Sequence, residues 1–289
     1  MEENRKVIQW FPGHMAKALR LIKEKIKVVD LVIEVLDARC PKSSMNDTIN
    51  EVINNKPLLL VLNKADLADK KELDKWVEYL SKDNIVVTLD SLNGTKNIKT
   101  INDATNTLLK ERNEKLLKSG VNIYPIRAMV IGIPNVGKST LLNNLAKRKA
   151  LDTGDRPGVT KNMQWLKAND NLLLLDNPGT LWPKFSSDLE ANSIALIGSI
   201  KDEILPISSV ANYGLTLMKE YYPSSLINRY KLTDLNKSNE ELFTEIGKKR
   251  GAIIKGGDVD LDKVYDLFLK ELRSGKLGEL SFERVEQFI

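Results

Sequence analysis

The chain has 289 residues, of which 42% are hydrophobic and 29% are charged, so it can bury the core of one large or two modest globular domains. No apolar run is long enough to cross a bilayer, and the first residues lack the apolar segment and cleavage site of a secretory signal. The single cysteine, Cys40, has no partner for an internal disulfide. We therefore expect a soluble protein of a reducing cytoplasm, without a membrane partner.

Basic side chains are concentrated in two segments of a chain whose net charge is +5. Residues 5–27 contain seven basic residues and one acidic residue, and Lys248, Lys249, Arg250 and Lys255 form a second cluster. Charge gathered in this way is typical of proteins that contact phosphate backbones. Two solvated helix faces are the alternative interpretation.

Apolar periodicity predicts alternating helices and strands in the first part of the chain. In chain order we expect a helix at 15–28, a strand at 30–36, a helix at 45–54, a strand at 57–62, a helix at 70–80, a strand at 85–89, a helix at 98–117, a strand at 126–131, a helix at 138–147 and strands at 163–167 and 172–175. Strands that alternate with crossover helices indicate a three-layer α/β domain with a mostly parallel sheet.

The pattern changes after residue 182. Helical spacing recurs at 188–197, 210–221, 240–250 and 261–273, with almost no strand signal. The sequence therefore predicts two domains: an α/β domain over residues 1–182 that includes a basic amino-terminal helix, and an all-α domain over residues 183–289.

Residues 132–139 fit the phosphate-loop pattern G-x-x-x-x-G-K-[ST], between a predicted strand and a predicted helix. Glycines allow backbone N–H groups to point at phosphate oxygens, and the helix that follows adds its positive dipole end. Lys138 is expected to bridge the β- and γ-phosphates, and Ser139 to bind Mg²⁺. The nucleotide contacts predicted in this loop are Asn135, Val136, Gly137, Lys138, Ser139 and Thr140.

Two further segments supply candidates for the γ-phosphate and the metal. Asp176, at the end of a four-leucine strand, begins a D-x-x-G element, so we expect it to hold Mg²⁺ through water while the Gly179 amide contacts the γ-phosphate. Thr160, in the polar loop 154–160, is the candidate switch threonine, both as a metal ligand and as part of the catalytic set with Lys138. Thr153 is the alternative.

Asn63-Lys64-Ala65-Asp66 has the form of a guanine-reading N-K-x-D tetrad at the end of a predicted strand. The Asp66 carboxylate can accept from guanine N1–H and the exocyclic amine together, which adenine cannot offer. The Lys64 stem is expected to pack over the base. The amides of Ser91 and Leu92, after the next strand, are expected to contact the guanine oxygen.

The tetrad precedes the phosphate loop, whereas most GTPases have the opposite order. With this order, the chain resembles the ribosome-biogenesis GTPase A family, which consists of circularly permuted GTPases acting in large-subunit assembly. The resemblance rests on Trp10-Phe11-Pro12-Gly13-His14, Asp37-Ala38-Arg39, the tetrad, the phosphate loop and the D-x-x-G element. It implies GTP hydrolysis with Mg²⁺, a helical carboxy-terminal domain that contacts RNA, and a late 50S precursor, with its rRNA and ribosomal proteins, as partner.

The group that activates water is not given by the usual motif. Ras-like enzymes place a glutamine just after D-x-x-G, but this chain has Thr180-Leu181-Trp182 there. The resemblance points instead to a histidine of the amino-terminal motif, here His14, the only histidine in the chain. Its ordinary pKa suits an orienting or general-base role, and a surface histidine at the start of a basic helix is the alternative.

Asn135 and Arg39 each leave two interpretations open. An asparagine in this position of the phosphate loop is often associated with a bound K⁺, although turn geometry alone also explains it. Arg39 lies near the guanine-reading side, where a salt bridge or RNA contact is favoured over an arginine finger.

The motifs favour a GTPase, and the resemblance implies that its nucleotide state controls docking on ribosomal RNA. Because D-x-x-G runs directly into the helical part, GTP should bias the orientation of that part. A GTP-gated binding module with incidental hydrolysis is the second hypothesis, and a small-subunit or transfer-RNA factor is the third. We expect a monomer when free, and no DNA partner.

Overall fold

The computed structural model describes residues 20–46, 52–53, 56–90, 94–122, 124–146, 164–177, 179 and 185–289. Several predicted features lie outside these ranges, namely His14 with its motif, the loop 154–160 with Thr153 and Thr160, Ser91 and Leu92, and residues 180–182.

The described residues contain a six-stranded sheet in the order β3-β2-β1-β4-β6-β5. Its strands are β1 (Leu31–Asp37), β2 (Leu58–Asn63), β3 (Ile85–Thr88), β4 (Ile126–Ile131), β5 (Gln164–Asn169) and β6 (Leu172–Asp176). All neighbours pair in parallel except β5, which is antiparallel to β6. The mostly parallel sheet predicted from the sequence is therefore confirmed.

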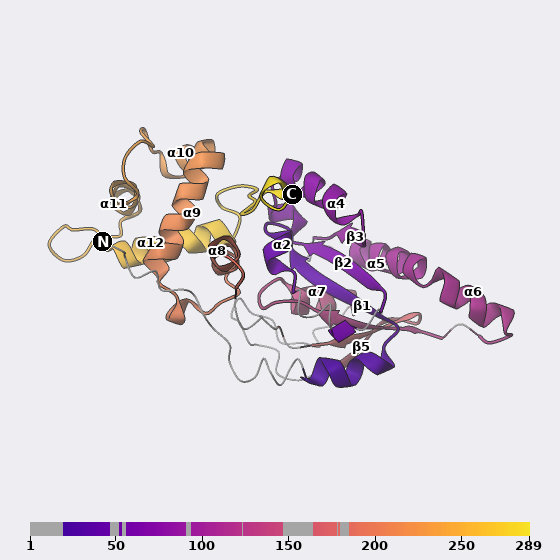
Figure 1. Cartoon of the computed structure of the whole chain (residues 1–289). Helices are drawn as coiled ribbons and strands as arrows, with labels where there is room; N and C mark the ends of the chain where they lie inside the picture. Colours follow the sequence, from indigo (N-terminus) through magenta and orange to yellow (C-terminus); the bar gives the residue numbers. More distant parts are fainter. Residues whose placement is uncertain are drawn as a thin grey trace.

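The two faces of β1 pack against different helices, which gives the domain three layers (Figure 1). Val32 packs with Ile22 of the helical residues 20–25, and Leu36 packs with Trp76 of α4 (Lys70–Leu80). On the other face, Ile33 belongs to the cluster that includes residues of α5 (Gly94–Leu108) and α7 (Lys138–Leu145). A strand covered on both faces is a near-continuous apolar run, as β1 is.

Two details of the first part differ from the prediction. The helix expected over 98–117 is divided at Leu109 into α5 and α6 (Lys110–Lys118), because the buried Leu109 side chain turns into the core while its backbone leaves helical geometry. The short helix α2 (Pro41–Ser44) was not predicted, and Met45 ends it. Of the helix expected over 45–54, Met45 and Asn46 are not helical, because Met45 leaves α2 in an extended conformation, whereas residues 52 and 53 are helical.

The second part of the chain is helical, as predicted. It contains α8 (Asp188–Leu196), α9 (Ile207–Tyr221), α10 (Pro223–Tyr230), α11 (Asn239–Arg250) and α12 (Leu261–Arg273), with 3₁₀ turns η3 (Asp202–Ile204) and η4 (Val285–Gln287). Ser187 and Ser238 cap the starts of α8 and α11 through their side chains. The helix α10 was missed by the sequence prediction.

The end of the chain returns from α12 to the α/β part (Figure 1). The Phe288 ring lies 5.5 Å from that of Trp76 in α4, and Val285 joins the apolar cluster that contains Leu36 and Leu62. The last residues therefore complete part of the core of the α/β domain. Among the described residues, none of the helices has the length and apolarity needed to span a bilayer.

Candidate functional site

The phosphate loop connects β4 to α7, and its glycines are required by the backbone. A Cβ on Gly132 would lie 2.5 Å from the carbonyl oxygen of Val35 in β1. Gly137, which begins α7, has φ of 86°, and Asn135 has φ of 63°, both in the left-handed region. These two residues turn the chain back toward the start of α7, which is the geometry of a loop that wraps phosphates.

The D-x-x-G element lies directly against the phosphate loop. Asp176 ends β6 opposite Val130 of β4, and a Cβ on Gly179 would lie 2.9 Å from the backbone nitrogen of Pro134. Lys138 Nζ lies 2.5 Å from Asp176 Oδ1, and both side chains are buried. The structure therefore brings together the two segments predicted to contact Mg²⁺ and the phosphates.

The residues of this corner fit a magnesium nucleotide. Mg²⁺ prefers oxygen ligands and usually keeps several waters. Asp176 Oδ2 is buried and has no hydrogen-bond partner among the described residues, so the carboxylate has an oxygen that suits the outer shell of such an ion. Ser139 stands next to Lys138 in the first turn of α7, where the N–H groups and the helix dipole favour anions.

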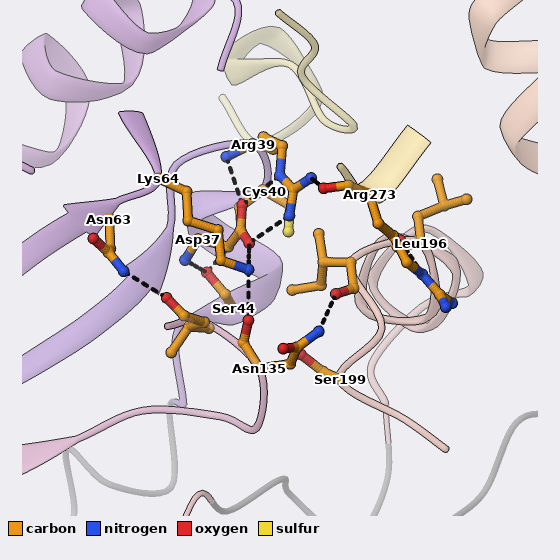
Figure 2. A network of polar contacts seen from close by, with 12 residues as sticks. Asp37, Arg39, Cys40, Ser44, Asn63, Lys64, Asn135, Leu196, Ser199 and Arg273 are labelled. Carbon is orange, nitrogen blue, oxygen red and sulfur yellow. Dashed lines mark hydrogen bonds and ion pairs between the residues drawn. The ribbon is translucent and has the colours of Figure 1, made fainter. Parts of the chain in front are cut away.

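The guanine-reading tetrad is tied to the phosphate loop by two hydrogen bonds (Figure 2). Asn63 Nδ2 donates to the carbonyl of Val136 at 2.8 Å, and Lys64 Nζ donates to the carbonyl of Asn135 at 2.5 Å. The partners are 73 and 71 residues apart in the chain. Because the tetrad comes first, these bonds join the two motifs in the reverse of the usual chain order.

The remaining tetrad residues form the 3₁₀ turn η2 (Ala65–Leu67). The Ala65 N–H donates to the Leu89 carbonyl at the end of β3, which fixes the start of the turn. Asp66 is exposed as a residue, but its carboxyl is partly shielded from solvent, which raises its pKa. The positive charges of Arg39 and Lys64 lower this pKa and so partly offset the effect. A base that donates two hydrogen bonds to this carboxylate would stabilise its charged form.

A buried ion-pair cluster lies beneath the tetrad. Arg39 donates from Nε and Nη2 to the two oxygens of Asp37, at 2.9 and 2.8 Å, and Lys64 Nζ lies 3.2 Å from Asp37 Oδ2. Burial acts to raise the pKa of Asp37, but the charges of Arg39 and Lys64 outweigh it and hold this pKa well below its ordinary value. Removing one partner from a buried pair costs about 3–5 kcal/mol.

This cluster decides between the interpretations of Arg39. Its guanidinium is buried and committed to Asp37, and Nη1 donates to the Arg273 carbonyl at 3.1 Å. The expected salt bridge is confirmed, and Arg39 has a structural role at the junction with the helical part.

The phosphate loop also contacts the helical part directly. Asn135 Nδ2 donates to the Ile197 carbonyl at 3.0 Å, just after α8, and a Cβ on the left-handed Gly198 would lie 3.0 Å from that nitrogen. Arg273, at the end of α12, donates to the Leu196 carbonyl at 3.0 Å (Figure 2). No motif indicated Arg273 or Gly198, because their roles depend on contacts between distant segments.

Of the predicted site residues, Asn63, Lys64, Ala65, Asp66, Asn135, Val136, Gly137, Lys138, Ser139, Thr140, Asp176 and Gly179 lie in the described part and surround one corner of the sheet. His14, Ser91, Leu92 and Thr160 lie outside the described residues.

Comparison with known proteins finds GTPases that are similar to this chain over nearly its whole length. A family profile described as "50S ribosome-binding GTPase" matches residues 127–212. The ribosome biogenesis GTPase A of Bacillus cereus is 48% identical over 98% of this chain and 95% of its own length, and that of Thermotoga maritima is 33% identical over 96% and 95%.

Solved structures agree with the sequences. A crystal structure of GNP-bound YlqF from T. maritima is 29% identical, has a TM-score of 0.64 and covers 93% of this chain and 98% of its own. A GDP-bound YlqF structure has a TM-score of 0.65 at 28% identity, covering 92% and 100%. The chain therefore belongs to the ribosome biogenesis GTPase A family and is a GTP-hydrolysing enzyme with a circularly permuted GTPase domain.

Proposed function

We propose that this GTPase binds the precursor of the large ribosomal subunit and promotes a late assembly step, with hydrolysis stimulated by the particle. The observation that carries the proposal is the junction at Asn135, whose carbonyl accepts from Lys64 of the tetrad and whose amide donates to Ile197 of the helical part. A residue shared by the nucleotide loop and the helical part provides a physical connection between GTP state and partner contact. The names of the relatives and of the matching profile supply the partner.

We propose the following roles at the site, of which the contacts of Asn63, Lys64 and Lys138 are supported by the geometry and the others by the motifs. Asn63 and Lys64 hold the tetrad on the phosphate loop, and Asp66, with the amides of Ser91 and Leu92, reads the base. In the loop, Lys138 neutralises phosphate charge, supported by main-chain and side-chain contacts from Asn135, Val136, Gly137, Ser139 and Thr140. Ser139, Thr160 and Asp176 would hold Mg²⁺, which would supply further positive charge, and Gly179 would contact the γ-phosphate. His14 orients the attacking water.

Asn135 itself is explained by its backbone. A φ of 63° is a conformation in which asparagine is enriched among non-glycine residues. We therefore keep K⁺ as a secondary proposal, behind the interpretation from turn geometry.

We propose that residues 183–289 form the domain that contacts RNA and the ribosome, and that residues 1–182 form the GTPase domain. Residues 183–289 contain 15 basic and 17 acidic side chains, so overall charge does not attract this part to RNA. The four residues of its basic cluster are all exposed, although Lys249 is paired with Glu245 and Arg250 lies over the Tyr230 ring. The long-range attraction is therefore assigned to the basic residues 5–27, and the helical part to local docking.

GTP state is proposed to bias how the helical part sits on the GTPase domain, through residues 176–183 and through the contacts of Asn135 and Arg39. We further propose that the protein acts in the cytoplasm and is monomeric when free. The buried Cys40, whose thiol pKa is raised by burial, is assigned a structural role.

Turnover measurements with ribosomal particles test the proposed function. Purified large-subunit precursors should raise the single-turnover rate of GTP hydrolysis by about 10²-fold or more, as expected when a general base or water-orienting group is completed. The variant His14→Ala should lose most of that stimulation while its GDP affinity stays within twofold. Small subunits, at the same salt concentration, serve as the matched control.

Each outcome separates the hypotheses. A rate that is indifferent to the large subunit supports the alternative, a GTP-gated RNA- or ribosome-binding switch with incidental hydrolysis. Equal stimulation by small subunits supports a factor of another particle. Unchanged stimulation in His14→Ala removes the catalytic assignment of His14.

A further inference from the structure

The end of the chain contacts the guanine-reading loop, residues 63–69, at Leu67, whereas Asn63 and Lys64 of the same loop contact the phosphate loop. We propose that residues 277–289, which we term the carboxy-terminal strap, position this loop and thereby set both guanine affinity and base discrimination. The inference rests on the proposed reading of the base by Asp66. It assigns a role in nucleotide binding to residues more than 200 positions away from the tetrad in the chain.

Two main-chain hydrogen bonds attach the strap to the edge of the site. The N–H of Leu280 donates to the carbonyl of Leu67 at 2.9 Å, and the N–H of Phe282 donates to the carbonyl of Arg39 at 2.7 Å. Leu67 directly follows Asp66, and Arg39 belongs to the ion-pair cluster beneath the tetrad. The strap therefore bridges the ends of β1 and β2, from which the guanine-reading residues emerge.

The hydroxyl of Tyr222, at the end of α9, links the strap to the helix after the tetrad. It donates to Asp69 Oδ2 at 3.1 Å and accepts from the Ser281 N–H at 2.9 Å and from Arg284 Nη2 at 3.0 Å. Asp69 caps the start of α4 by accepting from the Lys71 N–H at 2.9 Å. One hydroxyl thus joins α9, the strap and the first turn of α4.

Glu283 fixes the strap on its other side. Its carboxyl is buried and accepts from the N–H groups of Lys42 and Ser43, at 2.5 and 3.1 Å, and from Ser43 Oγ at 2.5 Å. These donors lie in the first turn of α2, which begins two residues after Arg39. The carboxyl therefore caps α2 at its amino-terminal end, where a helix favours an acceptor.

Asp66 is consequently held between two anchors. On one side, Asn63 and Lys64 bind the phosphate loop, and on the other, Leu67 and Asp69 bind the strap and Tyr222. Between them, Asp66 is exposed. A recognition group must be held within about 0.5 Å of its productive geometry by its supporting residues. Loosening one anchor should therefore weaken the two hydrogen bonds from guanine more than it weakens contacts to the phosphates.

The coupling is reciprocal. If the strap raises the affinity of the site for guanine nucleotides, those nucleotides must stabilise the docked strap by the same factor. Any contact that lifts the strap from Leu67 and Arg39 should equally favour nucleotide release. This gives the helical part a further connection to the site, separate from the contact of Asn135 with Ile197 and that of the Arg39 side chain with Arg273.

The variant Tyr222→Phe tests the inference with a single oxygen removed. The matched control is Tyr221→Phe, whose hydroxyl pairs with the neighbouring Glu220 and whose residue is 43% exposed. Calorimetry would give dissociation constants for GDP and for IDP, whose base lacks the exocyclic amine. Tyr222→Phe should weaken the binding of GDP three- to tenfold and the binding of IDP by a smaller factor. The preference for GDP over IDP should therefore fall. The control should change neither by more than twofold.

A fall in overall stability alone would not move the GDP-to-IDP preference, so an unchanged preference in folded Tyr222→Phe overturns the inference. Amide hydrogen exchange of the unmodified protein is the second measurement. Saturating GDP should slow exchange at Leu280 and Phe282 at least threefold, and unchanged exchange there also overturns it. A separate result would show that Asp66 does not read the base. In that case the variant Asp66→Asn would have the same preference between GDP and XDP as the unmodified protein.

Discussion

Replacing Asp66 with asparagine should move the preference of the site from guanine to xanthine nucleotides. The exposed carboxylate at this position offers two acceptors, whereas an amide offers one acceptor and one donor. Loss of charge-assisted hydrogen bonds, at about 1.5–3 kcal/mol each, should weaken GDP by about 10²- to 10⁴-fold. XDP, which has a carbonyl where guanine has its amine, should bind the variant more tightly than it binds the unmodified protein.

Competition against a fluorescent nucleotide measures both affinities in one experiment. Asp74→Asn, an exposed carboxylate of α4 outside the site, is the matched control and should alter neither affinity by more than twofold. If Asp66→Asn keeps the GDP affinity of the unmodified protein, another group reads the base.

Lys138→Met should reduce the rate of GTP hydrolysis by about 10²- to 10³-fold, the usual cost of removing one preorganised positive group from a developing charge. Lys138 lies in the first turn of α7, beside Asp176 at the end of β6. The Lys138 ammonium can pair with either the Asp176 carboxylate or a phosphate. Its loss should therefore also weaken the binding of GTP more than the binding of GDP. Single-turnover rates and the two dissociation constants measure these effects.

The buried Asp176 makes a folding control necessary for this variant. Without Lys138, the carboxylate is left in the interior without its partner at 2.5 Å, which is costly. Circular dichroism and thermal melting should therefore accompany the rates. Lys167→Met, which removes an exposed pair with Asp170, is the matched control and should leave turnover unchanged. A folded Lys138→Met that hydrolyses GTP within tenfold of the normal rate would contradict the assignment.

The sheet and the motif residues could be predicted because their signals are local. Buried parallel strands are continuous apolar runs, as in β2 and β6, and the N-K-x-D and G-x-x-x-x-G-K-S patterns have fixed spacing. Their order also predicted the permutation. What the motifs could not show was the pairing across the site, such as Asn63 with Val136, which depends on where β2 and β4 lie in the sheet.

Other features were missed because they leave no pattern in the sequence. The division at Leu109 interrupts an amphipathic pattern that continues on both sides. Helix α10 begins with Pro223, directly after α9. Only two of its residues, Leu226 and Tyr230, are buried, so its apolar periodicity is weak. At Leu67 and Arg39 the strap makes its contacts through backbone N–H groups, which any residue except proline supplies.

If segments in permuted order surround one guanine nucleotide, folded and nucleotide-free protein should distinguish GDP from ADP in titration calorimetry. We expect one GDP bound per chain and an affinity for ADP about 10⁴-fold weaker, as sites built to pair with a base donor achieve. Equal affinities for the two nucleotides, or no binding of either, would contradict it.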